Sequence, residues 1–219
     1  MMEHGGNIYL AAKELGLPYE NLIDFSASIN PLSVPKSVIS EITRNARHLF
    51  NYPDPDTREL RLHLSRHHRI NSDSILCGNG STELIYLIPK ALKPKRVLIH
   101  EPTFSEYERA CRTTSYKLKV ISYKLKREDN FEIETGAFIK SMKDCDMAFI
   151  CNPNNPTGKV LKREGVLDIA EAAKKARCRL IVDEAFIDFC PGNSVIDEVR
   201  NNPYLIVLRS MTKIYALSG

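Results

Sequence analysis

The stretch that decides the fold runs from residue 204 to residue 213 and reads YLIVLRSMTK. Its first five residues form an apolar run that is typical of a buried strand. A short turn rich in hydroxyl groups follows at once and contains Lys213. Open α/β sheets bind their ligands at such turns, outside the carboxyl ends of the strands. The same succession of apolar run and polar turn recurs earlier in the chain.

Five further apolar runs are found at residues 74–77, 96–100, 118–121, 147–150 and 179–182. Stretches of helical period separate them, such as Ser81–Leu92 and Arg163–Arg177. Strands that alternate with helices predict an α/β fold around a largely parallel sheet. Residues 1–73 instead predict a loop followed by several helices, including Pro35–Phe50 and Thr57–Ile70.

The composition is that of an ordinary globular protein, with 219 residues, 43% hydrophobic and 26% charged. The net charge of +4 comes from 31 basic and 27 acidic side chains that are interspersed, which argues against nucleic acid or a membrane surface as a partner. No apolar run approaches the roughly 18 residues of a membrane span, and the start lacks a signal pattern. These features predict a cytoplasmic protein.

Cysteine and histidine side chains give no sign of a metal site. The six cysteines form no CxxC pair, which predicts reduced thiols. His63, His67 and His68 include an i, i+4 pair but lack the glutamate of a metalloprotease motif. We therefore expect a solvated helix face and no bound metal.

Polar or aromatic segments follow five of the apolar runs: GNGSTE, EPTFSEY, CNPNNPTG, DEAFIDF and RSMTK. The glycines of Gly78–Glu83 precede a predicted helix, whose first N–H groups can bind a phosphate. An ordinary tight turn with a serine cap remains an alternative. Because parallel strands end at one edge of a sheet, we expect these segments to converge on one ligand.

Asp183 and Lys213 indicate what that ligand is. A carboxylate at the tip of a buried strand needs a partner, and the protonated ring nitrogen of a cofactor would be one. A helix cap or a salt bridge to a lysine is the alternative for Asp183. A desolvated lysine between the hydroxyl groups of Ser210 and Thr212 can act as a nucleophile and form a Schiff base. A lysine, an aspartate and a phosphate turn are the groups that pyridoxal phosphate requires.

At this point the sequence resembles a known family. The segments GNGSTE, NPNNPTG, DEAF and RSMTK resemble fold-type-I pyridoxal-phosphate enzymes of the aminotransferase class I/II superfamily, in the branch of the histidinol-phosphate aminotransferases. HGGN, IDFSASINPL and LRSMTKIYALSG resemble the threonine-phosphate decarboxylases of that branch. The resemblance implies a large domain with a mostly parallel mixed sheet flanked by helices. It divides the chain into an N-terminal arm and substrate loop, 1–34, and a cofactor domain, 35–219, without a C-terminal small domain.

The resemblance also implies roles for individual residues. Lys213 corresponds to the Schiff-base lysine, Asp183 to the partner of the ring nitrogen and Asn155 to the partner of the ring hydroxyl. Phe104 takes the place of the aromatic residue that stacks on the ring. Tyr52 matches a tyrosine that reaches into the neighbouring subunit of a homodimer, although a turn-flanking aromatic residue is the alternative. The cofactor phosphate would be held by Ser81, Thr82, Ser210 and Thr212, and a phosphorylated amino-acid substrate by His4, Asn7, Asn30 and Asn155.

Three functions remain open from the sequence. The first is decarboxylation of L-threonine O-3-phosphate to (R)-1-amino-2-propanol phosphate in cobalamin biosynthesis, which Phe186 favours because the aminotransferases usually carry tyrosine there. The second is a histidinol-phosphate or related aminotransferase. The third is a non-catalytic remnant, since the arginine that the family carries just beyond ALSG is missing. That ending predicts an N-terminal fragment with weak cofactor binding.

Overall fold

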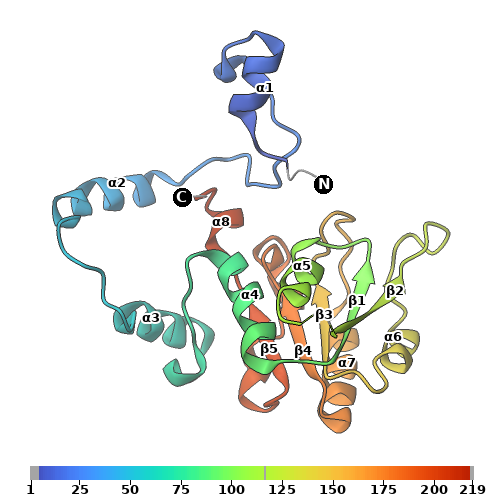
Figure 1. Ribbon diagram of the computed structural model, residues 1–219. Helices are drawn as coiled ribbons and strands as arrows, with labels where there is room; N and C mark the ends of the chain where they lie inside the picture. The colour runs from blue at the N-terminus through green and yellow to red at the C-terminus, as the bar shows by residue number, and fades with distance from the viewer. Residues whose placement is uncertain (1–4, 116, 218–219) are drawn as a thin grey trace.

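The computed structural model describes residues 5–115 and 117–217. Its centre is a five-stranded sheet in the order β2-β1-β3-β4-β5 (Figure 1). Every strand pairing in this sheet is parallel, where the sequence predicts a mostly parallel, mixed sheet. The strands are β1 (Arg96–Glu101), β2 (Lys119–Lys124), β3 (Met147–Cys151), β4 (Arg179–Asp183) and β5 (Leu205–Leu208).

Five of the six predicted strands form. Their ends lie within one residue of the expected bounds, except that β2 continues to Lys124. The predicted strand at residues 74–77 does not form. Instead, a short 3₁₀ turn at Ser72–Ser74 is followed by extended chain in which Leu76 is 71% exposed. A strand needs a neighbour for its backbone hydrogen bonds, and no described strand lies beside this segment, so the apolar run remains unpaired.

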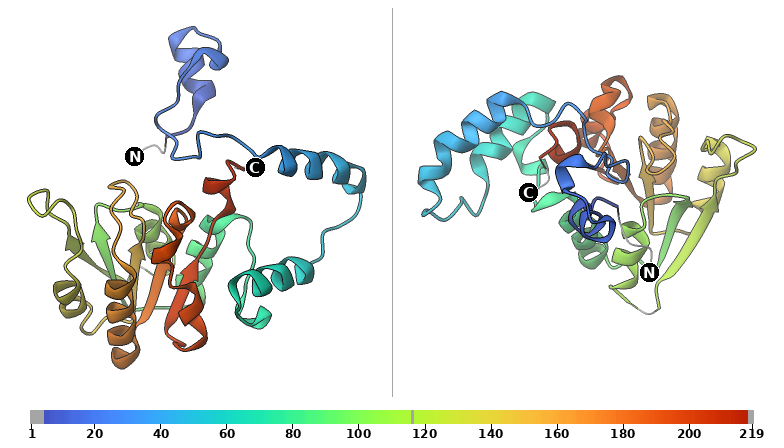
Figure 2. Two further views of the ribbon diagram at one scale, coloured as in Figure 1. Left: turned by 180° about the vertical axis from the view of Figure 1, so that it is seen from behind. Right: turned by 90° about the horizontal axis from the view of Figure 1, so that it is seen from above.

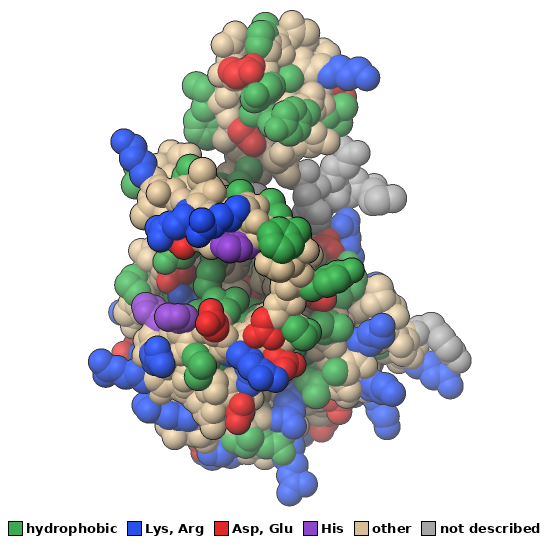
Figure 3. Space-filling view, turned by 90° about the vertical axis from the view of Figure 1, so that its left-hand side faces the viewer, with side chains coloured by type: hydrophobic (Ala, Val, Ile, Leu, Met, Phe, Trp, Pro, Cys, Tyr) green, Lys and Arg blue, Asp and Glu red, His purple; other side chains and the backbone are tan. Residues whose placement is uncertain are grey.

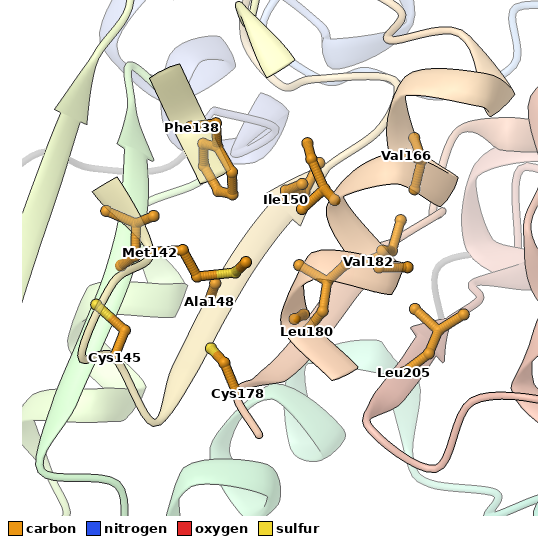
Figure 4. Close-up of a cluster of buried hydrophobic side chains, with 14 of the residues drawn as sticks. Phe138, Met142, Cys145, Ala148, Ile150, Val166, Cys178, Leu180, Val182 and Leu205 are labelled. Atoms are coloured by element: carbon orange, nitrogen blue, oxygen red, sulfur yellow. The ribbon is translucent and has the colours of Figure 1, made fainter. Parts of the chain in front are cut away.

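Helices cover both faces of the sheet (Figure 1). One face packs against α4 (Gly80–Leu92) and α5 (Glu106–Arg112) through a cluster that includes Val97 and Phe149. The other packs against α6 (Thr135–Ser141) and α7 (Arg163–Ala176) through the cluster drawn in Figure 4. Successive strand residues point to opposite faces. The middle residues of the central strands, Val97–Ile99, Met147–Cys151 and Leu180–Val182, are therefore apolar on both faces, as their sequences predict.

The N-terminal part lies apart from this sheet. It contains α1 (Ile8–Leu15), α2 (Lys36–Asn45) and α3 (Arg58–His68), and none of the three helices has a buried residue. Figures 1 and 2 show the three helices extending away from the sheet. At the top of Figure 3, hydrophobic side chains lie on the surface of the part of the chain that contains α1. The predicted helices Pro35–Phe50 and Thr57–Ile70 exist but are shorter, whereas α1, α5 and α6 were not predicted as separate helices.

Short helical segments complete the chain. The helix α8 (Met211–Ile214) follows β5. None of the helices in the described part of the chain is long and apolar enough to cross a membrane. Short 3₁₀ turns cover Tyr19–Asn21, Ala46–His48, Ser72–Ser74, Ile187–Phe189, Pro191–Asn193 and Ile196–Arg200.

Candidate functional site

The carboxyl ends of the strands meet at one edge of the sheet, and α8 lies at the same edge (Figure 1). Asp183 is the last residue of β4, and Lys213 lies in α8, directly after β5. Because β4 and β5 are parallel neighbours, with Asp183 paired to Leu208, the two residues approach the same edge. The fold thus brings together the two side chains that the sequence analysis singled out first.

Asp183 is a buried carboxylate, with 3% of the residue exposed. The hydroxyl of Tyr107 donates a hydrogen bond to Oδ2 at 2.7 Å, and the backbone N–H of Ala185 donates to Oδ1 at 2.9 Å. Burial raises the pKa of Asp183, while these two hydrogen bonds and the positive charge of Lys213 oppose the rise. A carboxylate accepts up to about four hydrogen bonds. Asp183 can therefore accept a further one from a cationic ligand.

Lys213 is half-buried, and its Nζ lies 5.6 Å from the ring centroid of Phe186. Its backbone carbonyl accepts a hydrogen bond of 3.0 Å from the N–H of Asn30. The side-chain amide of Asn30 also donates to the carbonyl of Ile214 at 2.7 Å. The last carbonyls of a helix have no partner within that helix, so the N-terminal segment caps the lysine turn.

Glu184, next to Asp183, has a structural role. It is 0% exposed and accepts hydrogen bonds from the Ser194 hydroxyl at 2.6 Å and the Val195 N–H at 2.7 Å. Arg209, which precedes the hydroxyl-rich turn, lies 3.6 Å from Glu184 and also bonds to Asp188. These contacts attach the start of the lysine turn to the loop that follows β4.

The loop after β3 uses two of its asparagines to hold its own shape. Asn152 exchanges a pair of hydrogen bonds with the backbone of Leu161, at 2.9 and 2.8 Å. Asn154 accepts a hydrogen bond of 2.9 Å from the hydroxyl of Thr103, in the loop after β1. Asn155 is half-buried beside them. These hydrogen bonds hold the loop that carries Asn155. The contact of Asn155 with a ring hydroxyl stays a prediction.

The glycine turn opens α4 as predicted. The Glu83 side chain accepts a hydrogen bond of 2.5 Å from the Asn79 N–H, and Gly80 has a φ of +79°, a conformation that favours glycine. Ser81 is half-buried and Thr82 is exposed in the first turn of the helix. Helix N–H groups in this turn have no intrahelical acceptor. They are therefore able to bind an anion. The serine-cap alternative is wrong, because the N-cap is Asn79, its side chain makes no capping hydrogen bond, and Ser81 lies inside the helix.

Tyr52 and Asn7 belong to the N-terminal part of the chain, before the first strand of the sheet. Tyr52 is 99% exposed, as a residue that reaches into a neighbouring subunit would be in a single chain. Asn7 caps α1, where its Oδ1 accepts a hydrogen bond of 3.0 Å from the Leu10 N–H. His4 lies outside the described residues. Ser210 is buried and Thr212 half-buried in the lysine turn.

Sequence reasoning missed Tyr107, which holds Asp183. It follows Phe104 by three residues, and the two rings meet edge to face at 5.7 Å. The sequence offers only the short spacing of the two aromatic residues in EPTFSEY, because α5 begins at Glu106, after Phe104. The hydrogen-bond partner, 76 positions later in the chain, could not be inferred from that spacing.

A cavity of about 730 Å³ lies elsewhere. It is lined by residues of α4 and of the loop before β2, including Lys90, Lys93 and Thr113, and it contains neither Asp183 nor Lys213. No group of three or more potential metal ligands occurs among residues 5–115 and 117–217.

The fold is that of an α/β protein in which Asp183 and Lys213 lie at the carboxyl edge of a parallel sheet. The sequence matches the family model for aminotransferase class I and II over residues 20–219, and the chain belongs to this family. The family is one of pyridoxal-phosphate-dependent enzymes. This result confirms the resemblance and the fold class that the sequence predicts.

Individual relatives agree with this assignment. The chain is 41% identical to a threonine-phosphate decarboxylase of Salmonella typhimurium over 99% of its own length and 59% of that protein. The histidinol-phosphate aminotransferase structure from Clostridium acetobutylicum matches 90% of the chain with a TM-score of 0.79 at 32% identity, and 57% of that protein is covered. The histidinol-phosphate aminotransferase of Sinorhizobium meliloti, solved with pyridoxal-5'-phosphate, shares the fold with a TM-score of 0.78 at 20% identity, over 88% of the chain and 53% of that protein. The chain thus spans a little over half the length of these relatives.

Proposed function

We propose that the chain is the cofactor-binding part of a pyridoxal-phosphate enzyme that decarboxylates L-threonine O-3-phosphate to (R)-1-amino-2-propanol phosphate, a step of cobalamin biosynthesis. The observation that carries the proposal is the buried carboxylate of Asp183 at the end of β4, next to β5 and the turn that carries Lys213. The choice of substrate is supported by the 41% identical relative from Salmonella typhimurium.

The residues at this edge fit pyridoxal phosphate. Asp183 has the burial and the spare acceptor capacity to pair with a protonated ring nitrogen. Lys213 supplies the amine that would hold the cofactor covalently, while Phe104 and Asn155 would contact its ring. The cofactor phosphate would be held by Ser81, Thr82, Ser210 and Thr212.

The chemistry divides between the cofactor and this chain. When bound, pyridoxal phosphate accepts the electrons of a bond that breaks at the α-carbon of an amino acid. The negative charge of Asp183 would keep a proton on the ring nitrogen. Lys213 Nζ, once neutral, can accept a proton at the α-carbon or return one to it. The ring of Phe186, 5.6 Å from Nζ, covers one side of the amine.

The orientation of the substrate decides between decarboxylation and amino transfer. We assign substrate binding to Asn7, Asn30 and Asn155, together with His4. The Asn30 amide donates one hydrogen bond to Ile214, and its second N–H can serve the substrate. In this assignment residues 1–34 form the arm and substrate loop, and residues 35–219 form the cofactor domain.

The proposed assembly is a homodimer in which Tyr52 completes the partner's site. The segment around Tyr52 supports this proposal, because Leu49, Phe50 and Tyr52 are 84%, 83% and 99% exposed. A contiguous apolar surface of this kind is typical of an interaction site. Tyr52 is the residue that the resemblance assigns to the dimer contact, and Leu49 and Phe50 are its neighbours in the chain.

A histidinol-phosphate aminotransferase is the second candidate, favoured by the Clostridium acetobutylicum structure. The test uses a full-length protein that contains this chain. It compares release of carbon dioxide from threonine phosphate with amino transfer from glutamate to imidazole acetol phosphate. Release without transfer supports the proposal, and transfer without release would replace it. If the loaded protein does neither, both candidate activities fail.

A further inference from the structure

We propose that Tyr107 is a positioning residue, which fixes the orientation and the negative charge of Asp183 and thereby the proton on the ring nitrogen of the cofactor. The proposal rests on the proposed function for its cofactor part. Its structural part, the coupling between Tyr107 and Asp183, can be tested without any cofactor.

The position of the Tyr107 ring leaves little freedom. The residue is 0% exposed in α5. Its ring stacks on Phe149 of β3, with centroids 5.0 Å apart and an interplanar angle of 18°. On another side it meets the edge of Phe104 at 5.7 Å. Packing on these two rings aims the hydroxyl at Asp183, 2.7 Å away.

The hydroxyl acts as a donor throughout the ordinary pH range. Burial, and after it the nearby charge of Asp183, raise the pKa of Tyr107 well above its usual value, so the phenol stays protonated. Cys151 of β3 also faces this pair, and burial raises its pKa to about 12. With Cys151 neutral, Lys213 of α8 is the cationic group that acts on Asp183.

Two donors therefore fix the plane of the Asp183 carboxylate. Ala185 bonds to Oδ1 from the strand side, and Tyr107 bonds to Oδ2 from α5. The Tyr107 hydrogen bond comes next after burial among the influences on the pKa of Asp183, and it lowers that pKa. Loss of the hydroxyl would leave a buried charge with one donor fewer, which is costly. The carboxylate would then be less able to hold a charged ring nitrogen.

The variant Tyr107→Phe tests this role, because it keeps the ring packing and removes only the hydroxyl. The matched control is Tyr86→Phe, which removes a hydrogen bond of 2.6 Å from a tyrosine to the Glu106 carboxylate, away from Asp183. We expect Tyr107→Phe to bind pyridoxal phosphate about tenfold more weakly. The pH at which the visible spectrum of the bound cofactor changes should also shift. Tyr86→Phe should leave both properties as they are.

Unfolding of the cofactor-free chain gives an independent measurement. The penalty of Tyr107→Phe should be small in acid, where Asp183 is protonated, and should grow toward neutral pH as Asp183 ionises. In an Asp183→Asn background this pH dependence should vanish. A penalty that is the same at every pH, or the same in both backgrounds, would reduce Tyr107 to a packing residue and overturn the inference.

The two proposals can fail separately. If the unchanged chain and its full-length form bind no pyridoxal phosphate, the proposed function fails, while the unfolding cycle still decides the coupling. If they bind it and Tyr107→Phe matches Tyr86→Phe in affinity and spectrum, the positioning role fails and the proposed function stands.

Discussion

The backbone N–H of Asn30 donates a hydrogen bond to the carbonyl oxygen of Lys213 at 3.0 Å. The Asn30 side chain continues the contact to the next carbonyl, that of Ile214, 184 positions later in the chain. A helix of four residues cannot satisfy its own last carbonyls. Asn30 thus joins the arm that precedes the sheet to the turn that carries the lysine.

Replacing Asn30 with alanine should loosen the lysine turn. The change removes the bond to Ile214 and leaves a carbonyl that needs water, so we expect cofactor affinity to fall about three- to tenfold. Titration with pyridoxal phosphate alone measures this without involving substrate. Asn45→Ala is a matched control, since Asn45 makes a similar amide bond to the Glu41 carbonyl in α2. Equal affinities for the two variants would show that the cap does not matter.

Asp183→Asn should separate stability from function. Burial raises the folded-state pKa of Asp183 above its unfolded value. The stability that this group contributes is therefore present in acid and lost as pH rises through the folded-state pKa. The neutral amide avoids that loss, so the cofactor-free variant should be as stable as the unchanged chain, or more so, at neutral pH. Its affinity for pyridoxal phosphate should nevertheless fall by about a hundredfold.

Denaturant unfolding at acidic and neutral pH measures the first effect, and cofactor titration measures the second. A variant that is destabilised equally at both pH values would show that the pKa of Asp183 is not raised in the folded chain.

The core beneath the site should respond to truncation in the usual way. Ile169 of α7 is 0% exposed. It packs in the hydrophobic cluster between the sheet and the helices α6 and α7. Ile169→Ala should lower the free energy of unfolding by about 2–5 kcal/mol, whereas Ile169→Val should lower it by about 0.5–1.5 kcal/mol. Equal effects of the two changes would mean that this side chain is not tightly packed.

The role of Tyr52 predicts complementation between two defective chains. Lys213→Ala removes a residue of one subunit's own site, and Tyr52→Ala removes a residue supplied to its partner. In a mixed dimer one site regains both residues, so mixing the variants should restore about a quarter of the cofactor sites if subunits exchange at random. Sedimentation of the mixture should show dimers. Dimers in which no sites are restored would place Tyr52 outside the partner's site.

The sequence predicted the sheet well where burial alone decides the structure. The runs at residues 96–100, 147–150 and 179–182 became β1, β3 and β4, because strands buried on both faces need apolar residues at every position. The run at residues 74–77 failed for the opposite reason. Its apolar residues carry no information about whether a neighbouring strand is present to pair with it.

The site divides in a similar way. Asp183 and Lys213 follow strands directly, so the topology of a parallel sheet places them at one edge. Tyr107 and the cap formed by Asn30 depend on contacts between residues far apart in the chain. No local pattern encodes those contacts, and the sequence gives only the residue types that could make them.

The attachment of pyridoxal phosphate to Lys213 is the central claim, and one measurement tests it directly. The loaded chain is treated with borohydride, which fixes a cofactor bound to an amine, and the labelled peptide is identified by mass spectrometry. Lys175→Ala, at an exposed lysine of α7, is the control for Lys213→Ala. We predict that the label lies on Lys213, that Lys175→Ala retains it and that Lys213→Ala loses it. A label on another lysine, or one that persists in Lys213→Ala, would contradict the account.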